Sequence, residues 1–212
     1  YLMISEGGTE RCHMLTMARS KNISGPYENC PNNPVMTNRS LRMKLVSVGH
    51  ADLIEDKNGN WWAICLGTRP YGYPPRHNLG RETMLVPVDW SGEWPVFGEK
   101  GSVLEEFETD LLPASAYQED ISERSFYDDF SSEKPDLGWI YIYNPDWSLF
   151  EWKKGSLCLW GNENHLRDAD TLAWIGRRQR HHVSKTEVSF QFACNSDGEE
   201  AGLTIFMNER HH

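Results

Sequence analysis

LIEDKNGNWWAIC, residues 53–65, decides the fold class of this chain. Apolar and polar side chains alternate on both sides of a short polar centre, which is the pattern of two half-buried β-strands. Asn58 and Gly59 stand at that centre, and both residue types tolerate the positive φ that a tight hairpin turn requires. The stretch therefore predicts an antiparallel β-hairpin. Its Trp61-Trp62 dipeptide would place one indole in the core and the other on a surface able to stack on a ligand.

Similar alternating runs lie on both sides of this hairpin, separated by turns rich in Gly, Pro, Asn and Ser. In the first half of the chain these runs cover residues 1–5, 12–19, 51–55, 61–66, 82–88 and 94–97. No segment longer than about ten residues carries a helical period. The pattern predicts an antiparallel all-β fold.

The chain changes character over residues 105–124, where it becomes acidic and only weakly periodic. We expect a connector there, and a second β series beyond it that would be buried by packing two sheets together. Strands of this series are predicted near residues 139–143, 156–160, 173–178, 186–193 and 202–207. The predicted organisation is a first domain at 1–112, a linker at 113–125 and a second domain at 126–212.

The charge of the chain limits its partners. Its 212 residues carry a formal net charge of −10, which disfavours nucleic acid and anionic membrane surfaces. No apolar run approaches the roughly 18 residues of a membrane-spanning helix. A neutral ligand fits better, and the 12% of aromatic residues include rings that could stack on a sugar as well as fill a core.

The five cysteines are odd in number and widely spaced. This spacing predicts free buried thiols rather than a disulfide framework or a zinc site. Free thiols favour a cytoplasmic location, with a secreted or periplasmic one left open. Because the chain starts at Tyr1 directly in a strand pattern, we expect it to be a piece of a longer protein.

Glu6 is the strongest candidate for a catalytic residue. In the sequence SEGGT it follows a strand pattern and precedes Gly7 and Gly8, whose lack of side chains would leave space for a ligand to approach the backbone. On these residues alone, such a pattern more often indicates a solvent-exposed glutamate in a turn. The glycines would then serve a bulge or a hairpin.

His50 and Arg81 are two further candidates. Gly49 and Ala51 flank His50 and leave room around an imidazole, which could donate to a sugar hydroxyl, ligate a metal or satisfy a hydrogen bond in the core. Arg81, in HNLGRET, could donate hydrogen bonds to a carboxylate or a ligand hydroxyl. It could equally form a surface ion pair with the neighbouring glutamate.

Taken together, these segments resemble a known family. The order YLMISEGGT, CHMLTMARS, SGPYENCPNNPVMTNR, VGHADLIED, GNWWAICLGTRP and HNLGRETMLVPVDW is similar to the C-terminal part of the five-bladed β-propeller of glycoside hydrolase family 43, in its β-xylosidase and α-L-arabinofuranosidase branch. The similarity covers about residues 1–112. Residues 126–212, with AWIGRRQRH and EEAGLTIFMN, resemble the first half of the concanavalin A-like β-sandwich that follows the propeller in many of these enzymes.

The resemblance implies roles for individual residues. Glu6 corresponds to the family's general acid, which protonates the leaving oxygen. His50 would lie beneath the sugar subsite or near a central ion, and Arg81 would bind substrate hydroxyls. Thr37, in MTNR, lies in a matching stretch and is expected to bind substrate, whereas His13 matches without an assigned role.

The activity implied is an inverting, exo-acting β-xylosidase or α-L-arabinofuranosidase, which releases a terminal pentose from xylo-oligosaccharides or arabinose side chains during xylan degradation. The family's general base and its pKa-tuning aspartate belong to earlier blades, and no stretch of this chain matches them, so the chain alone is expected to be inactive. No cofactor is expected to be required; a structural Ca²⁺ near His50 and a homo-oligomer are left open. The alternative is a non-catalytic carbohydrate-binding protein, a degenerate propeller that kept the pocket and lost the base.

Overall fold

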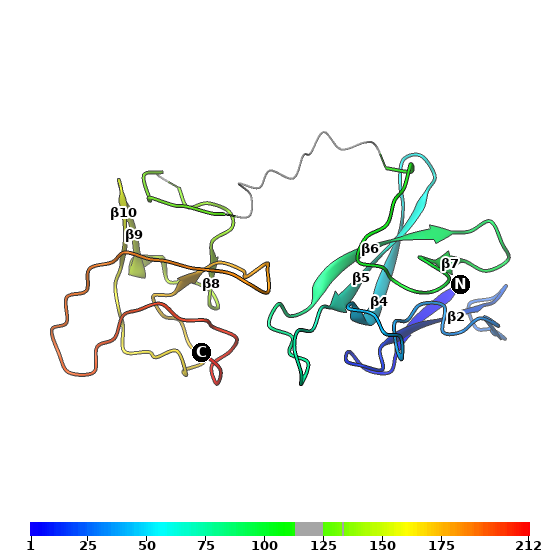
Figure 1. Cartoon of the computed structure of the whole chain (residues 1–212), viewed down its shortest axis with the longest axis horizontal. Helices are drawn as coiled ribbons and strands as arrows, with labels where there is room; N and C mark the ends of the chain where they lie inside the picture. The colour runs from blue at the N-terminus through cyan, green and yellow to red at the C-terminus, as the bar shows by residue number, and fades with distance from the viewer. Residues whose placement is uncertain (113–124, 133) are drawn as a thin grey trace. The chain divides into compact units, whose positions relative to one another are not determined.

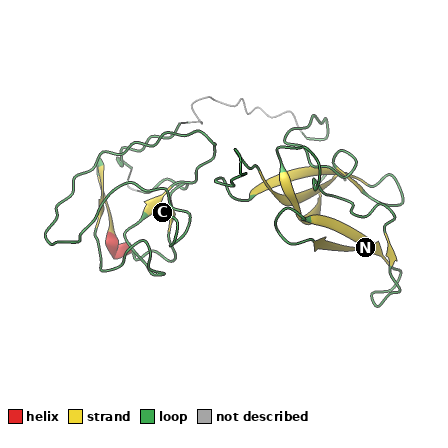
Figure 2. Ribbon diagram, turned by 60° about the horizontal axis from the view of Figure 1, so that its bottom comes forward, coloured by secondary structure: helices red, strands yellow, loops and turns green. Residues whose placement is uncertain are grey.

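The computed structural model describes residues 1–112, 125–132 and 134–212 (Figure 1). Contacts divide the chain into two compact units, Tyr1–Ala116 and Tyr117–His212. All of the predicted linker except Ser125 lies outside the described residues. Strands and loops make up both units in Figure 2, with one short helix in the described part of the chain. That part contains no helix with the length and apolar character needed to cross a bilayer.

Two antiparallel sheets form the first unit (Figure 1). Their strands follow one another in chain order, three in one sheet and four in the other: β1 (Leu2–Glu6), β2 (Met14–Arg19) and β3 (Glu28–Asn29), then β4 (Val46–Glu55), β5 (Trp61–Thr68), β6 (Glu82–Asp89) and β7 (Val96–Phe97). Each run predicted in the first half of the chain overlaps one of these strands. The two-residue strand β3 was not predicted, because so short a segment carries no period.

The predicted hairpin is the β4–β5 turn. Gly59 has φ +85°, and Asp56 organises the turn by accepting hydrogen bonds from the backbone N–H groups of Asn58, at 2.8 Å, and Asn60, at 3.0 Å. Its second oxygen accepts from the Asn60 side chain, at 3.0 Å, and from Trp62 Nε1, at 3.1 Å. These hydrogen bonds, led by that of the Asn60 side chain, lower the pKa of Asp56 to about 2. A single carboxylate thus fixes the turn and one indole of the following strand.

The core of the first unit lies between the two sheets. Strand β4 packs against β1 and β2, and β5 and β6 are the two inner strands of the four-stranded sheet. Trp62 is buried, whereas Trp61 is half-buried and packs edge-on against Trp90. The large apolar side chains that are fully buried come from both sheets and from the connections between them: Leu15, Met17, Met36, Leu45, Val48, Val86, Phe97 and Val103. Each stabilises the unit by roughly 1.5–3 kcal/mol relative to an exposed position.

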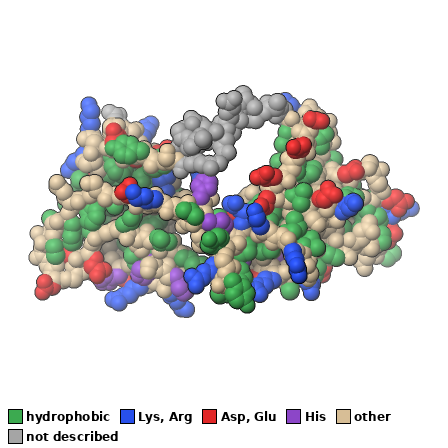
Figure 3. Space-filling model, in the orientation of Figure 1, with side chains coloured by type: hydrophobic (Ala, Val, Ile, Leu, Met, Phe, Trp, Pro, Cys, Tyr) green, Lys and Arg blue, Asp and Glu red, His purple; other side chains and the backbone are tan. Residues whose placement is uncertain are grey.

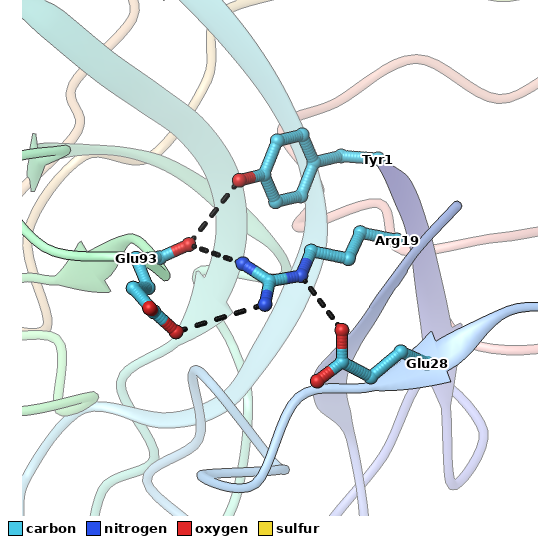
Figure 4. Close-up of polar contacts among 4 residues, drawn as sticks. All are labelled: Tyr1, Arg19, Glu28 and Glu93. Atoms are coloured by element: carbon cyan, nitrogen blue, oxygen red, sulfur yellow. Dashed lines mark hydrogen bonds and ion pairs between the residues drawn. The ribbon is translucent and has the colours of Figure 1, made fainter. Parts of the chain in front are cut away.

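Arg19, on β2, ties the first sheet to the loop before β7 (Figure 4). Its Nε donates to Glu28 Oε2 at 3.0 Å, and its Nη1 donates to the backbone oxygen of Glu93 at 3.0 Å. The same oxygen accepts from the Tyr1 hydroxyl at 3.2 Å, and the guanidinium lies 4.4 Å from the centre of the Trp94 ring. The planar guanidinium of arginine can stack on an aromatic ring and donate several hydrogen bonds at once. A single side chain can therefore bridge the two sheets.

The second unit contains less regular structure. It has two antiparallel pairs, β9 (Phe150–Lys153) with β10 (Ser156–Leu159) and β8 (Ile140–Tyr141) with β11 (Ile175–Gly176), and a 3₁₀ turn at Trp147–Leu149. The strands predicted near 139–143, 156–160 and 173–178 are each present in shortened form.

The strands predicted at 186–193 and 202–207 are wrong. Both segments are irregular in the structure, and among the described residues no strand pairs with them. Their alternating apolar side chains, such as Val188, Phe190 and Ile205, are exposed rather than packed against a facing layer. An alternating apolar pattern does not by itself form a strand. The segment also needs a neighbouring strand to pair with and a facing layer to bury its apolar side chains.

The five cysteines are all free, as predicted. Cys30 and Cys65 are buried, as expected, and burial raises the pKa of the Cys65 thiol to about 12. Cys12 and Cys194 are exposed, which corrects the expectation that all of these thiols are buried.

Candidate functional site

Glu6 is the last residue of β1, paired across the ladder with Met14 of β2. Its side chain is exposed, and among the described residues no hydrogen bond or ion pair holds its carboxylate. The hairpin therefore presents the carboxylate to solvent at the end of the sheet, without fixing its orientation.

The two glycines after Glu6 serve different needs. Gly7 has φ +77°, and a Cβ placed on it would lie 1.9 Å from the backbone oxygen of Cys12. Gly8 has φ +71°, but a Cβ there would meet nothing within 4 Å. Gly7 is thus required by the close return of the chain, and only Gly8 borders open space of the kind expected for a ligand.

Arg81 lies against this same hairpin. Its Nη1 is 3.5 Å from the hydroxyl oxygen of Thr9, the residue after the two glycines. Glu82 does not pair with Arg81, because Arg69 holds the Glu82 carboxylate by two hydrogen bonds of 2.7 and 2.8 Å. The structure thus separates the two arginines: Arg69 forms the structural ion pair, and Arg81 remains exposed beside the turn.

His50 lies on β4 where the strand is irregular. The register with β5 shifts twice, between Val46 and Gly49 and again between Gly49 and Asp52. His50 falls in the second shift, has φ +54° and is exposed. Bulges of this kind re-aim a side chain relative to the strand and are frequent beside active sites.

The hydroxyl of Thr37 is engaged by the backbone. Its Oγ1 donates to the backbone oxygen of His13 at 3.0 Å and accepts from the N–H of Arg39 at 3.0 Å. Since a hydroxyl carries one hydrogen, Thr37 has only an acceptor position left for a ligand.

The contacts bring some of the candidates together and leave others apart. Arg81 meets the Glu6 hairpin through Thr9, and Thr37 meets it through His13. Among the described residues, no hydrogen bond or ion pair links the side chains of Glu6, His50 and Arg81 directly. Thr9 was missed as a candidate, although its place directly after the glycines was a signal that could have found it.

A structural calcium near His50 would need a set of oxygen ligands around it. Ca²⁺ prefers six to eight oxygen ligands. In the described part of the chain, no group of three or more His, Cys, Asp or Glu side chains is arranged to hold a metal. Backbone carbonyls, side-chain amides and waters can also supply these oxygens, so a structural calcium near His50 stays a prediction.

Acidic and basic side chains are interspersed with apolar ones on the face of the first unit shown in Figure 3. No single sign of charge dominates that face, which suits a neutral ligand.

Two family models match the chain. Residues 1–95 match glycosyl hydrolases family 43, and residues 127–212 match the beta xylosidase C-terminal concanavalin A-like domain. The all-β fold predicted from the sequence, propeller blades followed by a concanavalin A-like sandwich, is confirmed by the β-structure and by these matches.

Individual relatives agree with the family models. A non-reducing end alpha-L-arabinofuranosidase of Bacteroides ovatus is 39% identical over the whole chain, which covers 40% of that protein. A xylosidase/arabinosidase of Butyrivibrio fibrisolvens is 32% identical, again over the whole chain and 41% of the relative. A solved structure described as Bacteroides ovatus xyloglucan PUL GH43B has a TM-score of 0.75 and 40% identity, with 84% of this chain and 35% of that one covered. The chain therefore spans about two fifths of the length of the curated relatives it matches.

Proposed function

The chain belongs to glycosyl hydrolase family 43, and from this membership we propose that the whole protein is an inverting, exo-acting β-xylosidase or α-L-arabinofuranosidase. Its substrates would be short xylo-oligosaccharides or arabinose side chains, from which it releases the terminal pentose. The observation that supports the proposal is the contact of Arg81 with the SEGGT hairpin, because the exposed guanidinium reaches Thr9, three residues after the candidate acid.

In this proposal Arg81 and His50 hold the hydroxyls of the pentose, and Glu6 protonates the leaving oxygen. An inverting hydrolase also needs a carboxylate base about 6.5–9.5 Å from the acid, so that a water fits between them. No stretch of this chain matches the family's base, and we propose that the purified 212-residue chain does not hydrolyse pentosides.

A general acid has to be protonated at the working pH, which requires burial or a neighbouring negative charge. The described residues leave Glu6 exposed and unpaired, so in this proposal the rest of the protein supplies that environment. The same exposure favours the second candidate, a carbohydrate-binding propeller in which the carboxylate has no catalytic partner.

The test uses the full-length protein and two leaving groups. Glu6→Gln should reduce turnover of unactivated xylobiose far more than turnover of 4-nitrophenyl β-xyloside or 4-nitrophenyl α-L-arabinofuranoside, because a good leaving group needs no proton. Glu10→Gln is the matched control, since Glu10 is an exposed glutamate of the same turn.

Equal losses on both classes of substrate would assign the acid to another residue. A wild-type protein that binds xylobiose but releases no pentose would support the binding protein instead. The ratio of the two nitrophenyl activities decides between xylosidase and arabinofuranosidase.

A further inference from the structure

His13 is a buried histidine that contacts β4. It precedes β2, and only 4% of it is exposed. Its Nδ1 lies 3.2 Å from the backbone oxygen of Ser47 on β4. A carbonyl oxygen can only accept, so this contact requires the hydrogen on Nδ1. The backbone oxygen of His13 accepts from Thr37, so one residue joins the Glu6 hairpin to β4 and to the Thr37 segment.

Gly49 makes room for this imidazole. A Cβ on Gly49 would lie 2.6 Å from His13 Nε2 and 2.7 Å from the adjacent ring carbons. The small residue before His50 therefore accommodates His13 rather than His50, which corrects the expectation drawn from the sequence. The ring of His13 fills the space directly behind the backbone that carries His50.

The backbone at this point is strained. Ser47 and His50 have φ +58° and +54°, and they fall in the two register shifts of β4. A left-handed conformation disfavours residues that carry a Cβ, and it persists only where the surroundings impose it. His13 contacts both shifts, through its hydrogen bond to Ser47 and its packing on Gly49.

We propose that His13 is a positioning residue: it holds the double bulge of β4 and thereby sets the direction of His50 toward the sugar. The proposal rests on the proposed function, in which His50 binds substrate. His13 touches no ligand in it and acts only through His50.

A double-mutant cycle in the full-length protein tests the coupling. His13→Leu should lower kcat/KM by about 10- to 100-fold, because misplacing a binding group by about 1 Å has effects of that order. In a His50→Ala background the same change should cost less than about twofold, since the residue through which His13 acts is gone. His13→Asn should recover most of the loss, because its amide nitrogen can donate from near the position of Nδ1.

Asn33→Leu is the control for a general loss of stability. Asn33 makes two hydrogen bonds to the backbone of Met17 on β2, at 2.8 and 2.9 Å, rather than to β4. Its removal should weaken the fold and leave the effect of His50→Ala on kcat/KM unchanged. If His13→Leu costs the same factor with and without His50, His13 is a structural residue and the proposal fails.

Amide hydrogen exchange supplies a readout that does not need activity. His13→Leu should speed exchange in the peptide that covers residues 46–55, and Asn33→Leu should not. Unchanged exchange in that peptide overturns the role of His13 even if the enzyme is active. A wild-type protein without pentosidase activity overturns the proposed function, and the exchange result still decides whether His13 holds the bulge.

Discussion

The Nη1 atom of Arg81 lies 3.5 Å from Oγ1 of Thr9, although 72 positions separate the two residues in the sequence. This distance is at the outer limit of a hydrogen bond, so the contact locates the guanidinium without engaging all of its donors. The remaining donors are available to a ligand beside the Glu6 hairpin.

We therefore expect Arg81→Ala to lower kcat/KM for pentosides by about 10- to 100-fold, the range of a lost charged hydrogen bond of about 1.5–3 kcal/mol. Arg81→Lys should recover only part of this loss, because lysine keeps the positive charge but cannot donate two parallel hydrogen bonds as a guanidinium does. Steady-state kinetics on the full-length protein measure both effects. Arg42→Ala, at another exposed arginine, is the control, and a similar loss there would mean that overall charge matters rather than the site.

Gly7 and Gly8 provide a matched pair for the hairpin. Both have positive φ, so alanine at either position costs about 1–2 kcal/mol from the left-handed backbone. Only at position 7 would the new methyl also collide with the oxygen of Cys12. We expect Gly7→Ala to lower the thermal unfolding midpoint clearly more than Gly8→Ala. Equal effects would show that the hairpin shifts freely and does not fix the Glu6 backbone.

Local and distant features of this fold differ in how well the sequence predicts them. The β4–β5 hairpin was predictable because Asn58 and Gly59 act on their immediate neighbours. The contact of Arg81 with Thr9 was not, because it depends on how two hairpins pack. The segment 186–193 shows the reverse error: its alternation is local, but a strand also needs a partner, and the described residues provide none.

The candidate site shows the same division. Glu6, His50 and Arg81 were selected with roles, yet His13, which contacts Ser47 and Thr37, lay in a matching stretch with no role assigned to it. Its signal was indirect, since Gly49 is small because a side chain from a distant segment occupies the space beside it. Such a cause is visible only once β2 and β4 are seen to pack together.

Asp56 gives the stability of the first unit a dependence on pH. Its pKa is about 2 in the folded protein, below the ordinary value of 3.8, because its hydrogen bonds favour the carboxylate. The stabilisation is fully present above pH 3.8 and is lost as the pH falls toward 2. We expect Asp56→Ala to lower the unfolding midpoint at pH 6, and the difference from wild type to narrow between pH 4 and pH 2.

Asp52→Ala is the control for Asp56, because Asp52 is an exposed aspartate of the same hairpin. Its effect should be small at every pH. A difference between wild type and Asp56→Ala that stays constant down to pH 2 would show that the turn depends on the size of the side chain and not on its charge.

Arg19 makes ion pairs, a stacking contact and a hydrogen bond to a backbone oxygen, and substitutions and salt can separate these interactions. Its ion pairs with Glu28 and Glu93 are at the surface and weakened by salt, whereas its stacking on Trp94 is largely insensitive to salt. Arg19→Ala should lower the unfolding midpoint by a few degrees, and Arg19→Met should lower it less, because methionine keeps apolar contact with the indole. In high salt, wild type and Arg19→Met should converge while Arg19→Ala stays below both. If Arg19→Met is as unstable as Arg19→Ala at every salt concentration, the hydrogen bond to the Glu93 backbone oxygen is the main connection between the sheets.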